Sequence, residues 1–473
     1  MAKSTKFSLK LLVDEKRNKV VLAEASQDFV DVLYGLLTLP MGTIARLLEK
    51  HQKLPQVLCC YKNLNKSVAD VVVDDFETEA CKSMLMYPKS TKEIHCRRLK
   101  LNIDDTTATK FFVCSNVHSC KSYSNFSTSR CKCGYSMVHQ VQVPEEEQCV
   151  DGLFVSCRSS FIITDDLKVR FNSIDGIVEV VSGLGYSCLS DLREMLADVG
   201  FDEVFTLLAN VFTSESPLTC AFLRKHCVTR MDKPLSPVLT TGRVEQATRC
   251  YVKVFVRKLD RKIIYAECSE DFVDSLLTFL VFPLELAASF SNDNTILGCV
   301  RNLCRGGCRR ELDYRSLPHY YTCSKKLLDI HSYPSQAYEC KVSQCYPFLC
   351  DYELSRWIDR SLVGKNERVV TVSPIDPKKS ISGTPTIGVD DIGFVKRQTK
   401  FIVSDDLTIT PMNKFSTIGL LKKMEINMKD IEAQSICIHK AELINILSAS
   451  LTSSSALTNG LSYLLAKEPK KET

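Results

Sequence analysis

Two stretches of this sequence align without a gap: AEASQDFVDVLYGLLTLP, from Ala23 to Pro40, and AECSEDFVDSLLTFLVFP, from Ala266 to Pro283. Their apolar residues recur at helical spacing, which predicts an amphipathic helix in each, with Phe29 and Phe272 buried and a proline closing or kinking it. The preceding segments, KLLVDEKRNKVVL and KVFVRKLDRKIIY, align at the same offset. In both segments apolar and polar residues alternate on either side of a polar turn, so each predicts a β-hairpin that leads into its helix.

Two further blocks match in the same order. FIITDDL begins at Phe161 and FIVSDDL at Phe401, while SPLT begins at Ser216 and SALT at Ser455. Collinear blocks about 240 residues apart indicate a tandem duplication rather than a solenoid, whose repeats are much shorter. We therefore expect two homologous domains of one plan.

The predicted fold class is α+β, with β-hairpins and packed amphipathic helices in each domain and an opening β-β-α unit. The expected boundaries are a first unit at 1–231, a linker at 232–248 and a second unit at 249–473. An apparent strand, Ser435 to Ile438, separates two helical stretches in the second unit. Residues 373–391 are rich in Pro, Gly and Ser, so we expect a mobile loop there.

The bulk composition is that of a globular protein and argues against a highly basic, secreted or membrane protein. The chain has 473 residues, 45% hydrophobic and 25% charged, which suits two globular domains. Its net charge of +5 is spread among mixed basic and acidic residues, a weak field for nucleic acid or anionic lipid. No secretory signal or membrane span is expected, so the predicted location is cytoplasmic, with the nucleus as the alternative. The 23 cysteines are expected to be thiols or metal ligands rather than a disulfide framework.

A cysteine cluster within 114–133 is the candidate metal site. Its members are Cys114, Cys120, Cys131 and Cys133, followed by Gly134. Four thiolates from two short segments can satisfy tetrahedral zinc, and a glycine after the second pair eases a tight turn. Two other hypotheses remain, buried unligated thiols and redox chemistry, and His118 or His139 could replace a cysteine. The predicted cofactor is a structural zinc.

The second half keeps the context of the first ligand, YYTC at Cys323 against FFVC at Cys114, and then loses the spacing. Cys340, Cys345 and Cys350 follow at different intervals. A metal in the second half is therefore not expected, and a site that one copy lacks favours a structural role.

Two charged pairs recur in both halves. Asp165-Asp166 and Asp405-Asp406 could bind a divalent cation, but Asp is also a common hairpin-turn residue, so we expect exposed, metal-free turns. Cys96-Arg97-Arg98 and Cys308-Arg309-Arg310 could hold a phosphate or carboxylate, although surface or salt-bridged arginines are the favoured interpretation.

Enzyme signatures are absent from the sequence. It contains no GxxxxGK[ST], no GxGxxG after a predicted strand, no HExxH and no GxSxG. No residue is therefore assigned a catalytic or cofactor-binding role.

The quoted blocks, together with FFVCSN and CKCG, resemble the plant proteins grouped as domain-of-unknown-function family 674. The resemblance covers nearly the whole chain and implies a plant origin and an intracellular protein, but no activity, ligand or catalytic residue. The second half departs from the pattern because it lacks a CxCG segment.

The preferred hypothesis is a non-enzymatic binding or interaction protein whose two related domains hold protein partners. The alternative is a zinc-assisted nucleic-acid-binding protein, which requires a contiguous basic face with exposed aromatics. An enzyme of unknown class is the third hypothesis and requires a deep pocket with convergent polar groups.

Overall fold

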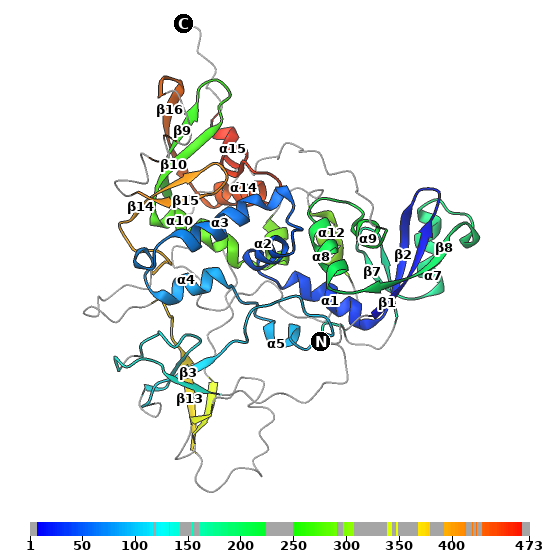
Figure 1. Cartoon of the computed structure of the whole chain (residues 1–473), viewed down its shortest axis with the longest axis horizontal. Helices are drawn as coiled ribbons and strands as arrows, with labels where there is room; N and C mark the ends of the chain where they lie inside the picture. Colours follow the sequence, from blue (N-terminus) through cyan, green and yellow to red (C-terminus); the bar gives the residue numbers. More distant parts are fainter. Residues whose placement is uncertain are drawn as a thin grey trace, which may run out of the picture.

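The computed structural model is a mixed α+β protein with three sheets and a central group of helices (Figure 1). It describes residues 7–116, 120–131, 133–141, 153–155, 160–223, 249–290, 297–306, 338–342, 347–348, 368–378, 392–412, 419, 422 and 428–465. Within these ranges no helix combines the length and the hydropathy needed to cross a bilayer. The expected linker lies outside the described residues, as does most of the predicted mobile loop, whose first residues, Ser373 and Pro374, instead end a β-strand.

The first sheet is antiparallel, with strand order β7-β6-β2-β1-β8. Its strands are β1 (Phe7–Asp14), β2 (Lys19–Ala25), β6 (Phe161–Thr164), β7 (Val169–Phe171) and β8 (Arg193–Val199). The two predicted hairpins, β1–β2 and β6–β7, are confirmed and pair with each other through β2 and β6. Strand β8, which the sequence did not predict, completes the sheet beside β1.

The second sheet has the equivalent order, β15-β14-β10-β9-β16, and is also antiparallel. Its strands are β9 (Cys250–Arg257), β10 (Ile263–Ser269), β14 (Lys400–Ser404), β15 (Ile409–Pro411) and β16 (Ile431–Ile438). In both sheets the first hairpin of the half is central, its second hairpin flanks one side and a later strand flanks the other. The predicted strand at Ser435 to Ile438 is the end of β16.

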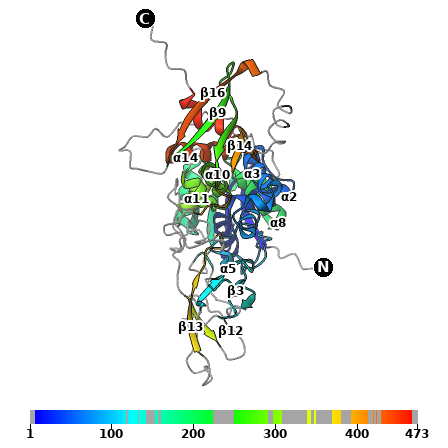
Figure 2. The ribbon, with the colours of Figure 1, turned by 90° about the vertical axis from the view of Figure 1, so that its left-hand side faces the viewer.

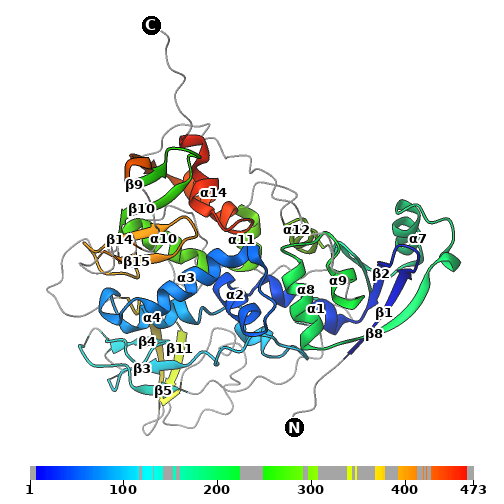
Figure 3. The same cartoon turned by 45° about the horizontal axis from the view of Figure 1, so that its top comes forward.

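Most helices lie between the two sheets (Figures 1 and 3). Those of the first half are α1 (Gln27–Leu37), α2 (Met41–Lys50), α3 (Cys59–Asp70), α4 (Glu79–Met86), α5 (Glu93–Cys96), α7 (Ile174–Gly183), α8 (Phe201–Asn210) and α9 (Pro217–Phe222). Those of the second half are α10 (Glu270–Val281), α11 (Leu284–Phe290), α12 (Gly298–Cys304), α14 (Lys440–Ser450) and α15 (Ala456–Leu461). Short 3₁₀ turns are η1 (Gln56–Leu58), η2 (Val73–Asp75), η3 (Leu189–Asp191), η7 (Met428–Asp430) and η8 (Ser462–Leu464).

The two halves cross each other at Pro40 and Pro283, which form an antiparallel bridge. The backbone N–H of Met41 donates to the Phe282 carbonyl at 2.8 Å, and the N–H of Leu284 donates to the Leu39 carbonyl at 3.0 Å. Each proline interrupts a helical run because it lacks an N–H and restricts the residue before it. The helix that follows each proline is thereby directed toward the other half of the chain.

The exchanged helices pack reciprocally, as Figure 3 shows. Helices α2 and α3 contact α10, and α3 also contacts β15, whereas α11 and α12 contact α1. The Asn63 amide on α3 donates to the Asp406 carbonyl at 3.0 Å, and the Asn302 amide on α12 donates to the Asp166 carbonyl at 2.9 Å. The packing units therefore mix the two sequence halves.

One hydrophobic core continues through both halves, from Leu9 in β1 to Leu465 near the end of the described chain. Phe29 on α1 and Phe272 on α10 are both fully buried in it, as predicted. The shared core follows from the exchange, because helices of each half pack against helices of the other and α3 also packs against β15.

Two buried carboxylates tie a distant loop to each central helix. Asp31 on α1 accepts hydrogen bonds from the backbone N–H groups of 153–155 at 2.8–3.1 Å. Asp274 on α10 accepts from the N–H groups of Phe394 and Val395 at 2.9 and 3.2 Å. The segments LFV and GFV that supply these donors lie at matching places in the two halves. They are a further cross-half match that the sequence analysis missed.

The expectation of exposed Asp turns is wrong, because the first carboxylate of each pair is buried and the second is half-buried. Both pairs lie at the predicted hairpin turns, but Asp165 and Asp405 are buried. Asp165 accepts from the N–H and the hydroxyl of Thr219 at 2.9 and 2.7 Å, and Asp405 accepts from the N–H of Thr458 at 2.7 Å. Each hairpin turn is thereby anchored to the last helix of its own half, which includes the SPLT or SALT block.

The third sheet projects from the helical centre, at the bottom of the view in Figure 2. Its order is β12-β11-β13-β4-β3-β5. The strands are β3 (Phe111–Val113), β4 (Ser122–Ser124), β5 (His139–Val141), β11 (Tyr338–Val342), β12 (Pro347–Phe348) and β13 (Arg368–Pro374). Strands β13 and β4 pair in parallel and join three strands of the first half to three of the second.

Candidate metal centre

The four predicted cysteine ligands lie in two loops, one between β3 and β4 and the other between β4 and β5. Cys114 follows β3 directly and Cys120 lies just before β4, so these two thiols are at the two ends of the β3–β4 loop. Cys131 and Cys133 lie in the turn that leads from β4 to β5. The turn is held by a bridge between Arg130 and Ser136. Two loops of one small antiparallel sheet thus bring all four thiols together.

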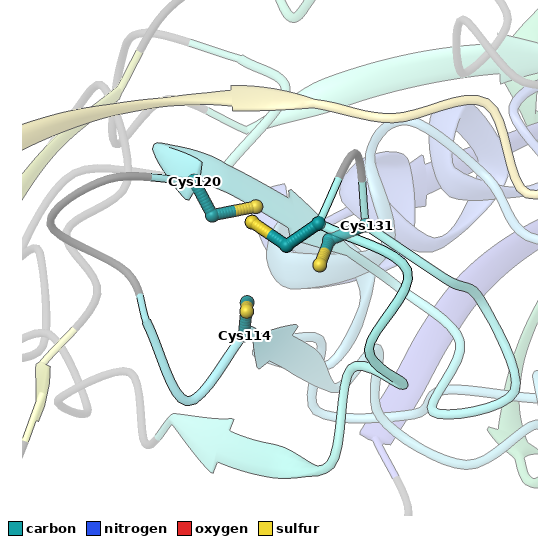
Figure 4. Close-up of side chains that lie close together, drawn as sticks. Cys114, Cys120 and Cys131 are labelled. Atoms are coloured by element: carbon teal, nitrogen blue, oxygen red, sulfur yellow. The ribbon is translucent and has the colours of Figure 1, made fainter.

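The four Sγ atoms lie within 4.8 Å of one another. Zinc–sulfur bonds of about 2.3 Å at tetrahedral angles place the sulfurs about 3.8 Å apart, so a small contraction would satisfy the ion. Figure 4 shows the side chains of Cys114, Cys120 and Cys131 converging on a common centre. Cys114, Cys120 and Cys131 are buried and Cys133 is exposed. The cluster could therefore hold a metal ion.

The backbone around the thiols has the features of a ligand turn. The N–H of Asn116 donates to Cys114 Sγ at 3.3 Å, a bond that a thiolate strengthens. The N–H of Cys131 donates to the Tyr135 carbonyl, and the N–H of Gly134 donates to the Cys131 carbonyl, each at 2.9 Å. Gly134 has φ +82°, a region that glycine occupies without strain. This is the role that the CKCG segment predicted for the glycine.

The proximity of the thiols changes their acidity. Burial raises the pKa of Cys131, but hydrogen bonds from Cys114 and the Cys133 backbone outweigh that effect and hold its pKa below the ordinary thiol value. Burial and the neighbouring Cys131 raise the pKa of Cys114. Hydrogen bonding to Cys120 raises the pKa of Cys133 to about 12. One thiolate therefore suppresses ionisation of its neighbours, and a divalent cation would remove that opposition.

The second half of the chain closes one side of the cluster. Ile375 packs against a small group of Cys114, Cys120, Cys131 and Met137 that also touches Phe112. The Ile375 N–H donates to the Tyr123 carbonyl at 2.9 Å. The cluster is thus a separate small core, stabilised by few apolar residues and by a strand from far along the chain.

Other sequence-predicted candidates do not join this cluster. The His139 ring pairs with the Ser115 hydroxyl at 2.9 Å, while His118 lies outside the described residues. Arg97 forms an ion pair with Glu93 at 2.6 Å, which supports the salt-bridged interpretation of that pair. Cys220 forms a disulfide, contrary to the expectation that all cysteines are thiols or ligands.

The second-half candidates lie largely outside the described residues. Cys323, Cys345 and Cys350 are not described, nor are Arg309 and Arg310. Cys340 belongs to β11, whose backbone alone is described. The prediction that the second half has no metal therefore stays a prediction.

The chain belongs to the family described as Protein of unknown function (DUF674), which it matches over residues 3–441. This confirms the resemblance that the repeated blocks and the CKCG segment indicated. No curated protein and no solved structure is significantly similar to the chain.

Proposed function

We propose that this member of the DUF674 family is a non-enzymatic binding protein whose related halves hold protein partners. One structural zinc orders the strands β3, β4 and β5 with their loops, which we call the cysteine-bearing lobe. The halves descend from one duplicated unit in this proposal. Their identical strand orders, the reciprocal helix exchange and the matched carboxylates Asp31 and Asp274 support that origin.

Exposed apolar side chains on α7 and in the chain from α7 to β8 are the observation that carries the protein-binding role. We call this set the α7 surface: Ile174, Val178, Leu184, Leu189 and Leu196. Helix α7 buries only Val181, in a small cluster with Val21 and Leu22 of β2. Ile174 is 81% exposed and Leu196 is 77% exposed.

Such a surface favours association with a protein. Burial of a large apolar side chain contributes about 1.5–3 kcal/mol, so several neighbouring ones give a strong drive for contact. Grouped exposed apolar residues mark interaction sites more often than single scattered ones do.

The test compares captured proteins between variants. Ile174→Glu combined with Leu196→Glu should abolish enrichment of specific partners in a quantitative affinity capture from the source organism. Leu259→Glu is the matched control, because Leu259 is 90% exposed in the β9–β10 turn, away from α7. A partner list identical for all three proteins would refute the α7 surface as the binding site.

Zinc is the metal that suits four thiol ligands at tetrahedral separation. The lobe around them has little apolar core, so ligation would contribute directly to its folding free energy. Purified protein should contain about one zinc per chain by elemental analysis, and Cys131→Ser combined with Cys133→Ser should remove it. Cys188→Ser is the control, since Cys188 is an exposed thiol outside the cluster.

A metal-free protein whose cluster thiols alkylate freely in the native state would refute the zinc proposal. Bound zinc that persists in the double serine variant would assign the ion to other ligands.

Nucleic-acid binding is the second candidate, and one observation favours it. Tyr251 on β9 is 62% exposed, with the Arg249 guanidinium 5.8 Å from its ring centroid. The Lys253 ammonium lies 5.0 Å from the Phe255 ring on the same strand. Alternating aromatic and basic side chains can stack on bases and pair with phosphates. Salt-dependent binding of a fluorescent single-stranded oligonucleotide, weakened by Tyr251→Ala, would support this candidate, whereas no binding at low salt would exclude it.

A further inference from the structure

A cavity of about 600 Å³ lies between helices α2 and α4 and the segment 105–110, beside the cysteine-bearing lobe. Its wall carries four basic residues, Arg46, Lys50, Lys89 and Lys110, and a single carboxylate, Asp105. This is a strongly cationic lining in a chain whose basic and acidic residues are otherwise nearly balanced.

Arg46 has hydrogen-bonding capacity that the protein does not use. Its Nη1 lies 2.7 Å from Asp105 Oδ1, and its guanidinium lies 5.3 Å from the Tyr87 ring centroid. Its Nε and Nη2 atoms are buried and have no partner among the described residues, and the same holds for the hydroxyl of Thr106. An unsatisfied buried donor costs about 1–3 kcal/mol, so three such groups at one cavity indicate a site shaped for a ligand with acceptor oxygens.

Lys89 is paired with Glu93 at 3.9 Å, but the other cations of the cavity outnumber their carboxylate partners among the described residues. Asp105 is shared between Arg46 and Lys50, whose Nζ lies 2.7 Å from Asp105 Oδ2. Lys110 forms no ion pair among the described residues. One carboxylate against two cations leaves an excess that an anion inside the cavity would balance.

The remaining wall is aromatic. Phe112 and Phe126 from the lobe and Tyr87 from the end of α4 line the cavity. The cavity volume lies in the range of small-molecule sites, about 300–1,000 Å³, which join an apolar wall to a few placed polar groups. The lining therefore suits a molecule with a charged end and a flat apolar body.

We propose that this cavity binds a small organic phosphate, with the phosphate held by Arg46 and Lys110 and the organic part against the aromatic wall. A phosphate ester carries a charge of about −1.5 to −2, which matches the excess better than a single carboxylate does. An arginine fork binds two phosphate oxygens at once. This site is separate from the α7 surface and does not depend on the proposed protein-binding function.

Calorimetric titration with phenyl phosphate tests the proposal, with benzoate and inorganic phosphate as comparison probes. Phenyl phosphate should bind at least tenfold more tightly than benzoate, and more tightly than inorganic phosphate, because it has both the dianion and the ring. Arg46→Lys retains a cation for Asp105 but loses the fork, and should weaken binding about tenfold. Lys110→Met, which breaks no ion pair among the described residues, should weaken it several-fold.

Lys16→Met is the matched control, because it removes one exposed lysine in the β1–β2 turn. Its affinity for phenyl phosphate should equal that of the unmodified chain. Undetectable phenyl phosphate binding at millimolar concentration would overturn the proposal, as would equal affinity for benzoate or unchanged affinity in Lys110→Met. The capture experiment on Ile174 and Leu196 tests different residues, so either proposal can fail alone.

Discussion

Replacing Asp274 by Asn should stabilise the protein at neutral pH, although it removes a carboxylate that makes two hydrogen bonds. Asp274 is buried on α10, and both N–H donors, from Phe394 and Val395, reach the same oxygen, Oδ1. An asparagine carbonyl at that place can accept both. The amide NH₂ would occupy the position of Oδ2, which accepts no hydrogen bond from the described residues, so its burial without an acceptor would offset about 1–3 kcal/mol of the gain.

The magnitude follows from the pKa of this carboxyl. Burial is the largest effect and raises the pKa of Asp274 from 3.8 to about 7, against the opposing hydrogen bonds. Because the folded pKa is raised, the associated stability is fully present below pH 3.8 and is lost as pH rises through about 7. At 1.36 kcal/mol per pKa unit, the loss is about 4 kcal/mol at most.

The assay is chemical unfolding at pH 4.5, 6 and 8. Relative to the unmodified chain, the unfolding free energy of Asp274→Asn should rise by about 3 kcal/mol between pH 4.5 and pH 8, because the unfolded carboxyl is already partly ionised at pH 4.5. Other buried carboxyls titrate equally in both proteins, so the difference isolates Asp274. A difference that does not change with pH would refute the reasoning.

Asp31 is the matched control, at the equivalent place on α1. Both of its oxygens accept backbone hydrogen bonds: Oδ2 from Leu153, and Oδ1 from Phe154 and Val155. Asparagine cannot accept on both sides, so Asp31→Asn leaves at least one N–H facing an amide donor. Burial also raises the pKa of Asp31, so both variants lose a buried charge at pH 8, and Asp31→Asn should be about 1–3 kcal/mol less stabilising than Asp274→Asn.

Three other predictions concern packing. Gly393→Ala adds a Cβ that would overlap the buried carboxylate on α10, so the unfolding free energy should fall by about 1–3 kcal/mol. Gly183→Ala is the control, because no atom lies within 4 Å of its added Cβ. In the same denaturation assay it should be neutral within about 0.5 kcal/mol. Phe29→Ala or Phe272→Ala should each cost about 3–5 kcal/mol, and a loss below about 1 kcal/mol would contradict their burial in the shared core. A protease site placed in the linker between the halves should, after cleavage, leave the two fragments together in size-exclusion chromatography; their separation in native buffer would contradict the reciprocal exchange.

Local patterns in the sequence determined the hairpins, the central helices and the candidate metal ligands. Alternation in the β1–β2 segment and helical spacing in α1 depend on neighbouring residues, so they are readable without tertiary information. Strand β8, REMLADV, escaped prediction because it is an edge strand in which only Val199 is buried. Its pairing with β1, rather than its own pattern, makes it a strand.

Only the tertiary structure shows which half of the chain each helix packs against. Pro40 and Pro283 were readable as helix breaks, but the direction of the chain after a break depends on which apolar surface lies within reach. Burial of Asp165 was also unreadable, because Asp suits an exposed turn equally well until Thr219 supplies its donors.

Of the two candidate sites, one was predictable from the sequence and the other was visible only in the tertiary structure. Cysteine is a rare ligand type at recognisable spacing, so the sequence alone determined the members of the metal cluster, and the fold then placed their sulfurs within 4.8 Å of one another. The cationic cavity has no such signal: Arg46, Lys89 and Lys110 are ordinary residues in sequence. They become a site only because α2 and the segment before β3 pack side by side, a juxtaposition set by long-range burial.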